Sequence, residues 1–301
     1  MRRIRIAVCL IFLASCGIFG VYMFQTRMVE DHTPPVITCR EDTISVSVEA
    51  QDEEILSGVT ASDDKDGDIT DSVRISSMSH FIEKGKRYVT YIVFDHANQA
   101  GTAQRTLLYT DYHSPRIHLT QPLRYSISQI SSGDPKMELT AEDCLDGDLT
   151  NQIRTTLSSN YYELLPGDYS VTVQVSNSAG DVCSVPMQVT LIDSTDREEG
   201  KKLYPMLEEY ILYTQAGREL DLKAGLTGFI RGGQEYSFEE AEEYLGVTSG
   251  DIVVQSSVNY DQPGVYTVEY SCTTGGTVNE DSTVQEDAVT AVTKLYVVVE
   301  E

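Results

Sequence analysis

The stretch SDDKDGDIT, residues 62–70, decides the fold because it returns 80 residues later as EDCLDGDLT, residues 142–150. The likeness continues downstream, where the alternating apolar residues of 89–93 match those of 171–175. Alternation with a period of two predicts half-buried β-strands. An internal repeat of this length predicts a row of similar modules, each folded as one small β-domain.

A turn and a closing strand complete each copy. The turn DHANQ, residues 95–99, corresponds to NSAGD, residues 177–181, so that Asn98 stands where Gly180 does. Both residue types tolerate a positive φ, which a tight turn requires. The strands that we expect around these turns are 43–49, 102–110 and 184–192.

These motifs resemble a known type of module. The opening PPVIT of residues 34–38, the acidic segment and the run PGDYSVTVQVSNSAG of residues 166–180 are similar to bacterial Ig-like modules of the hyalin-repeat type. Such modules occur in pesticidal crystal proteins and in surface proteins of Gram-positive bacteria. The resemblance covers residues 34–194 and implies tandem, extracytoplasmic β-sandwiches with no shared enzymatic activity.

The predicted fold class is all-β, with an N-terminal transmembrane helix followed by three tandem Ig-like β-sandwich modules. The third module is diverged, and its segment SFEEAEEYLG, residues 237–246, carries a capping box and a terminal glycine that predict one short helix. The charged junction 193–202 predicts a flexible connection. The predicted boundaries are an anchor over 1–27, a tether over 28–33, and modules over 34–112, 113–194 and 195–301.

The N-terminal segment indicates a membrane anchor. Three arginines precede an uncharged run from Ile6 to Phe24, whose length is close to the roughly 20 residues of a spanning helix. We therefore expect a single-pass plasma-membrane protein with a cytoplasmic N-terminus and the bulk of the chain outside. A second interpretation is a lipobox, LASCG at residues 13–17, in which Cys16 is lipidated after cleavage. Both interpretations make the membrane a partner.

The composition excludes some partners. The chain has 22 basic and 47 acidic residues, a formal net charge of −25, and 41% hydrophobic residues. The hydrophobic content is sufficient for folded cores. A surface this acidic repels nucleic acid, so we expect no nucleic-acid partner.

The acidic turns allow two interpretations. In the first, their aspartates cap a tight turn by accepting backbone N–H bonds, and no metal or other cofactor is needed. In the second, the carboxylates bind Ca²⁺, although the twelve-residue loop of an EF-hand is not present. The candidate Ca²⁺ ligands are Asp63, Asp64, Asp66, Asp68, Asp143, Asp146 and Asp148. Capping is the favoured interpretation, since the second copy has fewer carboxylates.

Other reactive residues follow no catalytic pattern. Cys144 and Cys183 share a module and could form a disulfide, with buried free thiols as the alternative. The five histidines have no metal-ligand spacing, and no nucleophile or phosphate-binding motif occurs. We therefore expect no catalytic residues, and an enzyme would require convergent carboxylates in the third module.

The predicted function is non-catalytic binding, adhesion or spacing at a cell surface. The expected partner is a cell-wall glycan or a surface protein. An alternative is an envelope-polysaccharide binder or an accessory factor in surface-polymer assembly, for which Tyr161 and Tyr162 could stack on a sugar.

Overall fold

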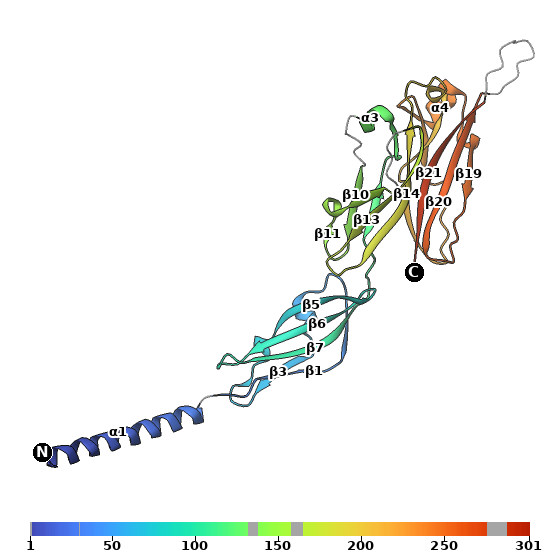
Figure 1. The fold of residues 1–301 in the computed structure, drawn as a ribbon. Coiled ribbons are helices and arrows are strands. Elements are labelled where there is room, and N and C mark those ends of the chain that lie inside the picture. Colours follow the sequence, from blue (N-terminus) through green and yellow to red (C-terminus); the bar gives the residue numbers. More distant parts are fainter. Residues whose placement is uncertain (1, 30, 132–137, 158–164, 276–287) are drawn as a thin grey trace, which may run out of the picture. The chain divides into compact units, whose positions relative to one another are not determined.

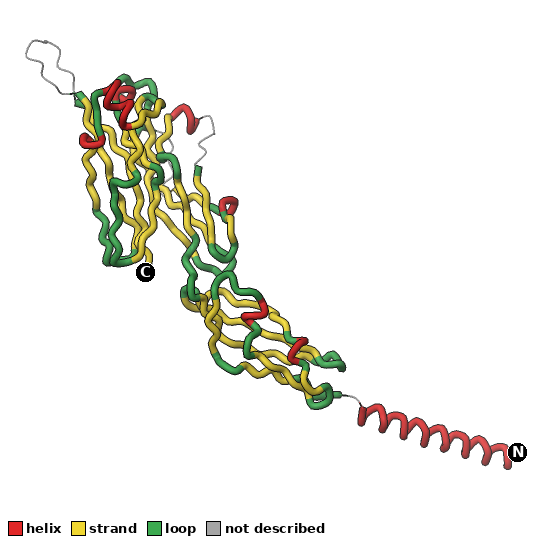
Figure 2. Tube along the Cα trace, turned by 180° about the vertical axis from the view of Figure 1, so that it is seen from behind, coloured by secondary structure: helices red, strands yellow, loops and turns green. Residues whose placement is uncertain are grey.

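The computed structural model describes residues 2–29, 31–131, 138–157, 165–275 and 288–301. It divides into two compact units, Met1–Tyr112 and His113–Glu301, which we describe separately. Strands dominate both units, and helices are few (Figures 1 and 2). The predicted all-β class is therefore confirmed for the part of the chain after the N-terminal helix.

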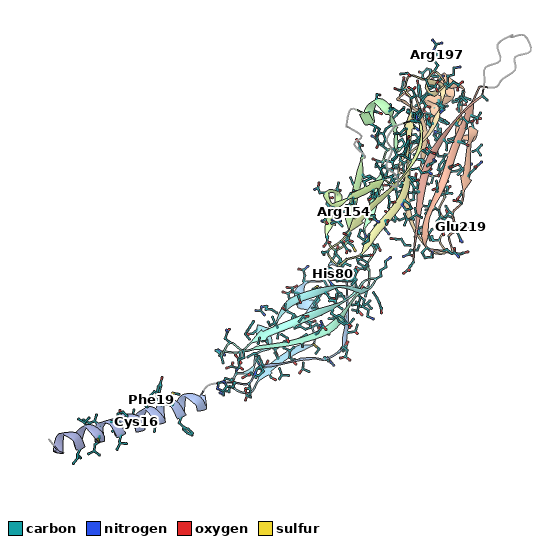
Figure 3. All side chains as sticks on the ribbon, viewed as in Figure 1. Cys16, Phe19, His80, Arg154, Arg197 and Glu219 are labelled. Carbon is teal, nitrogen blue, oxygen red and sulfur yellow. The ribbon has the colours of Figure 1, made fainter. Side chains whose placement is uncertain are left out.

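The chain begins with helix α1, Arg2–Val29. Within the described residues, no helix reaches the combination of length and apolarity needed to cross a bilayer. This finding corrects the expectation of a transmembrane helix over residues 6–24 and of a single-pass plasma-membrane protein. Cys16 lies on this helix with an exposed, free thiol (Figure 3).

The first unit contains one β-sandwich, made of a sheet in the order β1-β3-β4 and a sheet in the order β2-β7-β6-β5. The side chains of Val89, Tyr91 and Val93 on β6 are fully buried between the sheets. Buried Arg105 donates from Nε to the Tyr91 hydroxyl at 2.8 Å. The elements are β1 Val36–Cys39, β2 Thr43–Val46, α2 Asp52–Ile55, β3 Val59–Asp63, β4 Gly67–Asp68, η1 Thr70–Ser72, β5 Arg74–Glu83, β6 Lys86–Phe94 and β7 Ala100–Tyr109.

The second unit contains two sandwiches, and its first repeats the pattern of the first unit. Its sheets have the orders β11-β10-β8 and β12-β13-β14-β9. Val171, Val173 and Val175 on β13 are buried, as their alternation predicts. The elements are β8 Arg116–Leu119, β9 Arg124–Ser126, α3 Ile127–Ser131, β10 Leu139–Asp143, β11 Gly147–Asp148, η2 Thr150–Gln152, β12 Arg154–Leu157, β13 Gly167–Ser176 and β14 Val182–Ile192.

The last sandwich has sheets in the orders β15-β17-β18 and β16-β21-β20-β19. Its helix α4 begins at Ser237, which forms a reciprocal capping box with Glu240, and ends at Gly246 in the left-handed conformation. The predicted short helix is therefore confirmed. The elements are η3 Glu199–Lys201, β15 Tyr204–Leu207, β16 Ile211–Gln215, β17 Leu226–Arg231, β18 Gln234–Ser237, α4 Phe238–Leu245, η4 Ser249–Asp251, β19 Ile252–Ser256, β20 Gly264–Thr274 and β21 Val289–Glu300.

In every sandwich a short early strand pairs in parallel with the last strand. The pairs are β2 with β7, β9 with β14, and β16 with β21. In each case the preceding strand belongs to the opposite sheet, so the chain crosses from one sheet to the other near its start. This crossing joins the two sheets of each sandwich through the backbone.

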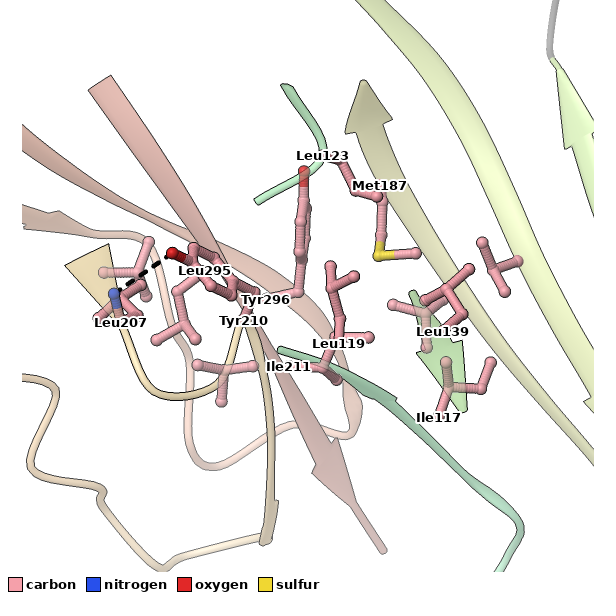
Figure 4. Close-up of a cluster of buried hydrophobic side chains, with 14 of the residues drawn as sticks. Ile117, Leu119, Leu123, Leu139, Met187, Leu207, Tyr210, Ile211, Leu295 and Tyr296 are labelled. Atoms are coloured by element: carbon pink, nitrogen blue, oxygen red, sulfur yellow. Dashed lines mark hydrogen bonds between the residues drawn. The ribbon is translucent and has the colours of Figure 1, made fainter. Parts of the chain in front are cut away.

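The two sandwiches of the second unit share one continuous cluster of buried residues, which runs from Ile117 to Val299 (Figure 4). Tyrosines of the last sandwich also form hydrogen bonds with backbone groups at unpaired strand edges of the neighbouring sandwich. The Tyr213 hydroxyl accepts from the Ile117 N–H at 2.7 Å and donates to the Ile117 carbonyl at 3.1 Å. The Tyr296 hydroxyl accepts from the Gln188 N–H at 2.7 Å. Such partners prevent the unpaired backbone groups of an edge strand from pairing with other chains.

Charged groups surround this buried interface. Arg116 forms an ion pair with Glu300 at 2.9 Å, and Lys294 forms one with Asp168. The expectation that the junction 193–202 would act as a flexible linker is wrong, because both sandwiches belong to one compact unit. Charged side chains of the junction pair with each other, as in the 2.7 Å ion pair between Lys202 and Glu199.

Candidate metal centre

The first acidic turn is built on Asp63, at the end of β3. One carboxylate oxygen, Oδ2, accepts from the backbone N–H groups of Lys65 and Asp66 at 2.8 and 3.0 Å. Gly67 follows with a φ of 73°, which favours glycine. These bonds are the ones that the capping interpretation predicts.

Capping uses only one side of Asp63. Its other oxygen, Oδ1, is buried and has no hydrogen-bond partner among the described residues, and the same holds for Oδ2 of Asp95. The two residues are only 9% and 8% exposed. Asp95 follows β6, and its Oδ1 accepts from the Gln99 N–H at 2.7 Å. Each carboxylate therefore holds its own turn with one oxygen and leaves the other unsatisfied.

A third carboxylate, that of Asp31, joins these two from the segment before β1. One oxygen from each of Asp31, Asp63 and Asp95 lies within 4.8 Å of the other two. The Thr33 N–H at 3.0 Å and the Thr33 hydroxyl at 2.8 Å donate to Oδ1 of Asp31 and lower the pKa of this carboxyl. The Lys65 ammonium lies beside this carboxylate, with Nζ 3.9 Å from Oδ1 of Asp31.

Strand pairing explains why segments far apart in the sequence meet here (Figure 1). The antiparallel register places Val36 opposite Ser62, so the chain before β1 lies beside Asp63. Gly101, which follows the turn that contains Asp95, packs directly against the chain before β1. A Cβ added at Gly101 would lie 2.1 Å from the Pro35 carbonyl oxygen. Only glycine allows this close backbone approach.

The remaining predicted ligands of the first turn have other partners. Asp64 accepts from the Thr33 hydroxyl, and Asp66 accepts from the His96 N–H at 2.7 Å. Asp68 accepts from the Thr70 N–H at 3.0 Å, and the Thr70 side chain lowers its pKa. These three side chains position backbone around the centre and do not belong to the converging group of three.

The second acidic turn has the same aspartate cap as the first, but the second oxygen of its capping aspartate has a hydrogen-bond partner. Oδ1 of Asp143 accepts from the N–H groups of Leu145 and Asp146 at 2.9 and 3.0 Å. Its Oδ2 accepts from the side-chain amide of Asn177 at 3.2 Å. Asn177 corresponds to Asp95 in the repeat. An amide donor thus stands in the second module where a second carboxylate stands in the first.

The other residues around the second turn are also engaged. Asp148 accepts from the Thr150 N–H at 2.9 Å, and the Thr150 side chain lowers its pKa. Asp146 accepts from the Ser178 hydroxyl at 2.7 Å. The residue 80 positions after Asp31 is Asp111, whose carboxylate accepts from the Val48 N–H at 2.8 Å.

Sequence reasoning identified Asp63 but missed Asp31 and Asp95. The repeat itself held the signal, since the turns 95–99 and 177–181 had been aligned and differ at their first position, aspartate against asparagine. Upstream, the 80-residue offset of the two acidic turns pairs Asp31 with Asp111.

Cys144 and Cys183 are not joined by a disulfide in the structure. Cys144 donates from Sγ to the His113 carbonyl at 3.2 Å, and Sγ of Cys183 lies 3.7 Å from the Tyr213 hydroxyl. Tyr161 and Tyr162, proposed as a sugar-stacking pair, lie outside the described residues. A shallow hollow of about 530 Å³ beside the second turn is lined by His113, His118 and Cys144, among other residues.

No family model matches the chain. The pesticidal crystal protein Cry22Aa of Bacillus thuringiensis is 28% identical over 134 residues, which are 44% of this chain and 18% of that protein. The chain thus spans less than a fifth of this relative's length.

A carbohydrate-binding module of Clostridium perfringens ZmpB, solved with GlcNAc and INT domains, is 19% identical, with a TM-score of 0.21, over 50% of this chain and 26% of that chain. Human CDH23 EC21-23 is 10% identical, with a TM-score of 0.20, over 88% of this chain and 100% of that chain. TM-scores of this size do not show a shared overall fold.

Proposed function

We propose that this chain is a non-catalytic, extracellular binding and spacing protein built from tandem Ig-like sandwiches. The observation that carries this proposal is the fused pair of sandwiches in residues 113–301. Their shared core and the tyrosine bonds to Ile117 and Gln188 join them into one compact unit. A compact unit with satisfied strand edges suits a protein that presents a binding surface.

The carboxylates of the first sandwich are compatible with a binding protein. Within the described residues, a group of three side chains that could hold a metal ion lies in this sandwich, at Asp31, Asp63 and Asp95. The net charge of −25 directs the choice of partner toward a neutral glycan or a protein with a basic surface.

A binding experiment on the full chain tests the proposal. The chain is immobilised and exposed to neutral and acidic cell-wall polysaccharides and to solubilised surface proteins. We expect saturable binding to one neutral glycan or one surface protein, no binding of polyanions, and no change in the mass of any bound polymer. Conversion of a polymer into shorter products would show an enzyme and would overturn the proposal, as would the lack of saturable binding to every probe.

A further inference from the structure

We infer that Asp31, Asp63 and Asp95 form a binding site for one divalent cation, with Ca²⁺ as its preferred ligand. This inference is independent of the proposed binding function. It concerns the end of the first sandwich where the chain enters β1.

The unsatisfied oxygens are the first observation. Oδ1 of Asp63 and Oδ2 of Asp95 belong to side chains that are at least nine-tenths buried, and neither oxygen has a hydrogen-bond partner among the described residues. A buried polar atom normally has a partner, and a buried charge normally has a counter-charge. Both residues belong to the group of three whose carboxylates converge to within 4.8 Å, so a proton, an amide or a cation placed among these carboxylates would supply the missing partner.

The second module shows what happens when an amide satisfies this requirement. There Asn177 replaces the second aspartate and donates to Asp143 at 3.2 Å, while its own Oδ1 accepts from the Asp181 N–H at 2.9 Å. Asp95 makes the corresponding bond to the Gln99 N–H at 2.7 Å. The turns that begin at Asp95 and Asn177 therefore share this backbone bond. They differ in their second side-chain atom, which is an amide donor in Asn177 and a carboxylate acceptor in Asp95.

The presence of Asp31 favours a bound cation over a shared proton as the partner of these oxygens in the first module. A shared proton bridges two oxygens, whereas here three carboxylate oxygens lie within 4.8 Å of one another. Like charges at this separation disfavour one another unless a cation lies between them. Lys65 places a partly exposed ammonium 3.9 Å from Asp31, whereas Oδ1 of Asp63 and Oδ2 of Asp95 have no hydrogen-bond partner among the described residues.

The chemistry of the ligands favours Ca²⁺. All three are carboxylates, which hard cations prefer, whereas zinc sites generally contain His or Cys. Oxygens at Ca²⁺ distances of about 2.3–2.6 Å lie up to about 5 Å apart across the ion, and the coordination number is flexible. Mg²⁺ requires stricter octahedral geometry at about 2.0–2.1 Å. Water can complete the coordination of either ion.

The cation would also attach residues 31–33 to the sandwich. Thr33 already connects them, since its carbonyl accepts from the Gln99 side chain at 3.4 Å and its hydroxyl contacts both Asp31 and Asp64. A cation held by Asp31 and by two residues of the sandwich would add a link of higher charge. Residues 31–33 should therefore resist proteases better with Ca²⁺ than with a chelator.

The full chain, freed of metal with a chelator, is titrated with CaCl₂ in a calorimeter and melted at Ca²⁺ concentrations up to about 10 mM, above the weakest Kd values of extracellular sites. We expect one Ca²⁺ per chain, a rise in the melting temperature of the first unit, and a weaker response to MgCl₂. Asp95→Asn copies the second module, so it should abolish both responses while melting in chelator at least as high as the unmodified chain.

Two further variants complete the test. Asp31→Asn removes a ligand that precedes the sandwich and should weaken Ca²⁺ binding at least tenfold without affecting folding. Asp68→Asn changes a carboxylate of the same turn that caps Thr70 outside the centre, and its Ca²⁺ response should stay unchanged. Retention of the Ca²⁺ response in Asp95→Asn would overturn the site. An unmodified chain that ignores Ca²⁺ would overturn it too, and a higher melting temperature of Asp95→Asn would then indicate a shared proton.

Discussion

The Tyr296 hydroxyl offers a direct test of whether the two sandwiches of residues 113–301 unfold together. This hydroxyl accepts from the Gln188 N–H at 2.7 Å, and β9 pairs with β14 only from Thr190 onward. The variant Tyr296→Phe keeps the buried ring and leaves the Gln188 N–H without its partner. Gln188 is exposed and this hydrogen bond is part-buried, so its loss should cost what an ordinary hydrogen bond contributes, about 0.5–1.5 kcal/mol.

The expected change in melting temperature follows from the size of the unit. For domains of about 150–250 residues, 1 kcal/mol corresponds to about 2–4 °C, so a loss of about 1 kcal/mol lowers the melting temperature by about 2–4 °C. Scanning calorimetry of the full chain should show one transition for residues 113–301 that shifts as a whole. The transition of the first unit should not move.

Tyr266→Phe is the matched control, because that hydroxyl donates to the Gln262 carbonyl at 2.9 Å within the last sandwich and is exposed. It should change the melting temperature by less than about 1–2 °C, since exposed substitutions usually stay within about 0.5 kcal/mol. The reasoning fails if Tyr296→Phe matches this control. It also fails if the second unit melts in two separate steps and only one of them shifts.

Further predictions concern the first core and the response to alkali. Gly101→Ala should destabilise the first unit by about 1–3 kcal/mol, since the new Cβ would lie 2.1 Å from the Pro35 carbonyl oxygen; urea unfolding checks this, and Gly200→Ala, which meets no atom within 4 Å, should have almost no effect. Arg105→Met removes buried hydrogen bonds from a charged group and should cost about 2 kcal/mol in the same assay; an unchanged midpoint would contradict the buried network. Burial raises the pKa of Tyr296 to about 12, above its unfolded value of about 10. Its contribution to stability is therefore complete below about pH 10 and is lost as the pH rises toward 12, so urea midpoints of the second unit should fall in that window, and less so in Tyr296→Phe.

Local patterns in the sequence predicted the strands well, since their cause is local. The alternation in 171–175 places Val171, Val173 and Val175 on one face, and the structure buries all three. The capping box at Ser237 likewise predicted α4, because its bonds join residues three positions apart.

Features that depend on contacts between residues far apart in the sequence could not be predicted. The junction 193–202 is charged, and composition alone could not show that β8 and β14 would lie against the last sandwich. Alternation along a strand shows which residues share a face but not whether that face contacts solvent or another domain. Tyr213 and Tyr296 could therefore not be recognised as interface residues. The exchange of Asp95 for Asn177 was visible in the repeat, but that Asp31 and Asp95 converge on Asp63 depends on contacts between distant segments.

The parallel pairing of each early strand with the last strand of its sandwich has a mechanical consequence. A force that pulls the two ends of a sandwich apart acts in opposite directions along these paired strands. It therefore loads their hydrogen bonds in shear and all at once, rather than opening them one by one. The pairing extends over four residue pairs between β2 and β7, three between β9 and β14, and five between β16 and β21. Under tension the β9–β14 connection, with the fewest pairs, should be the first of the three to rupture.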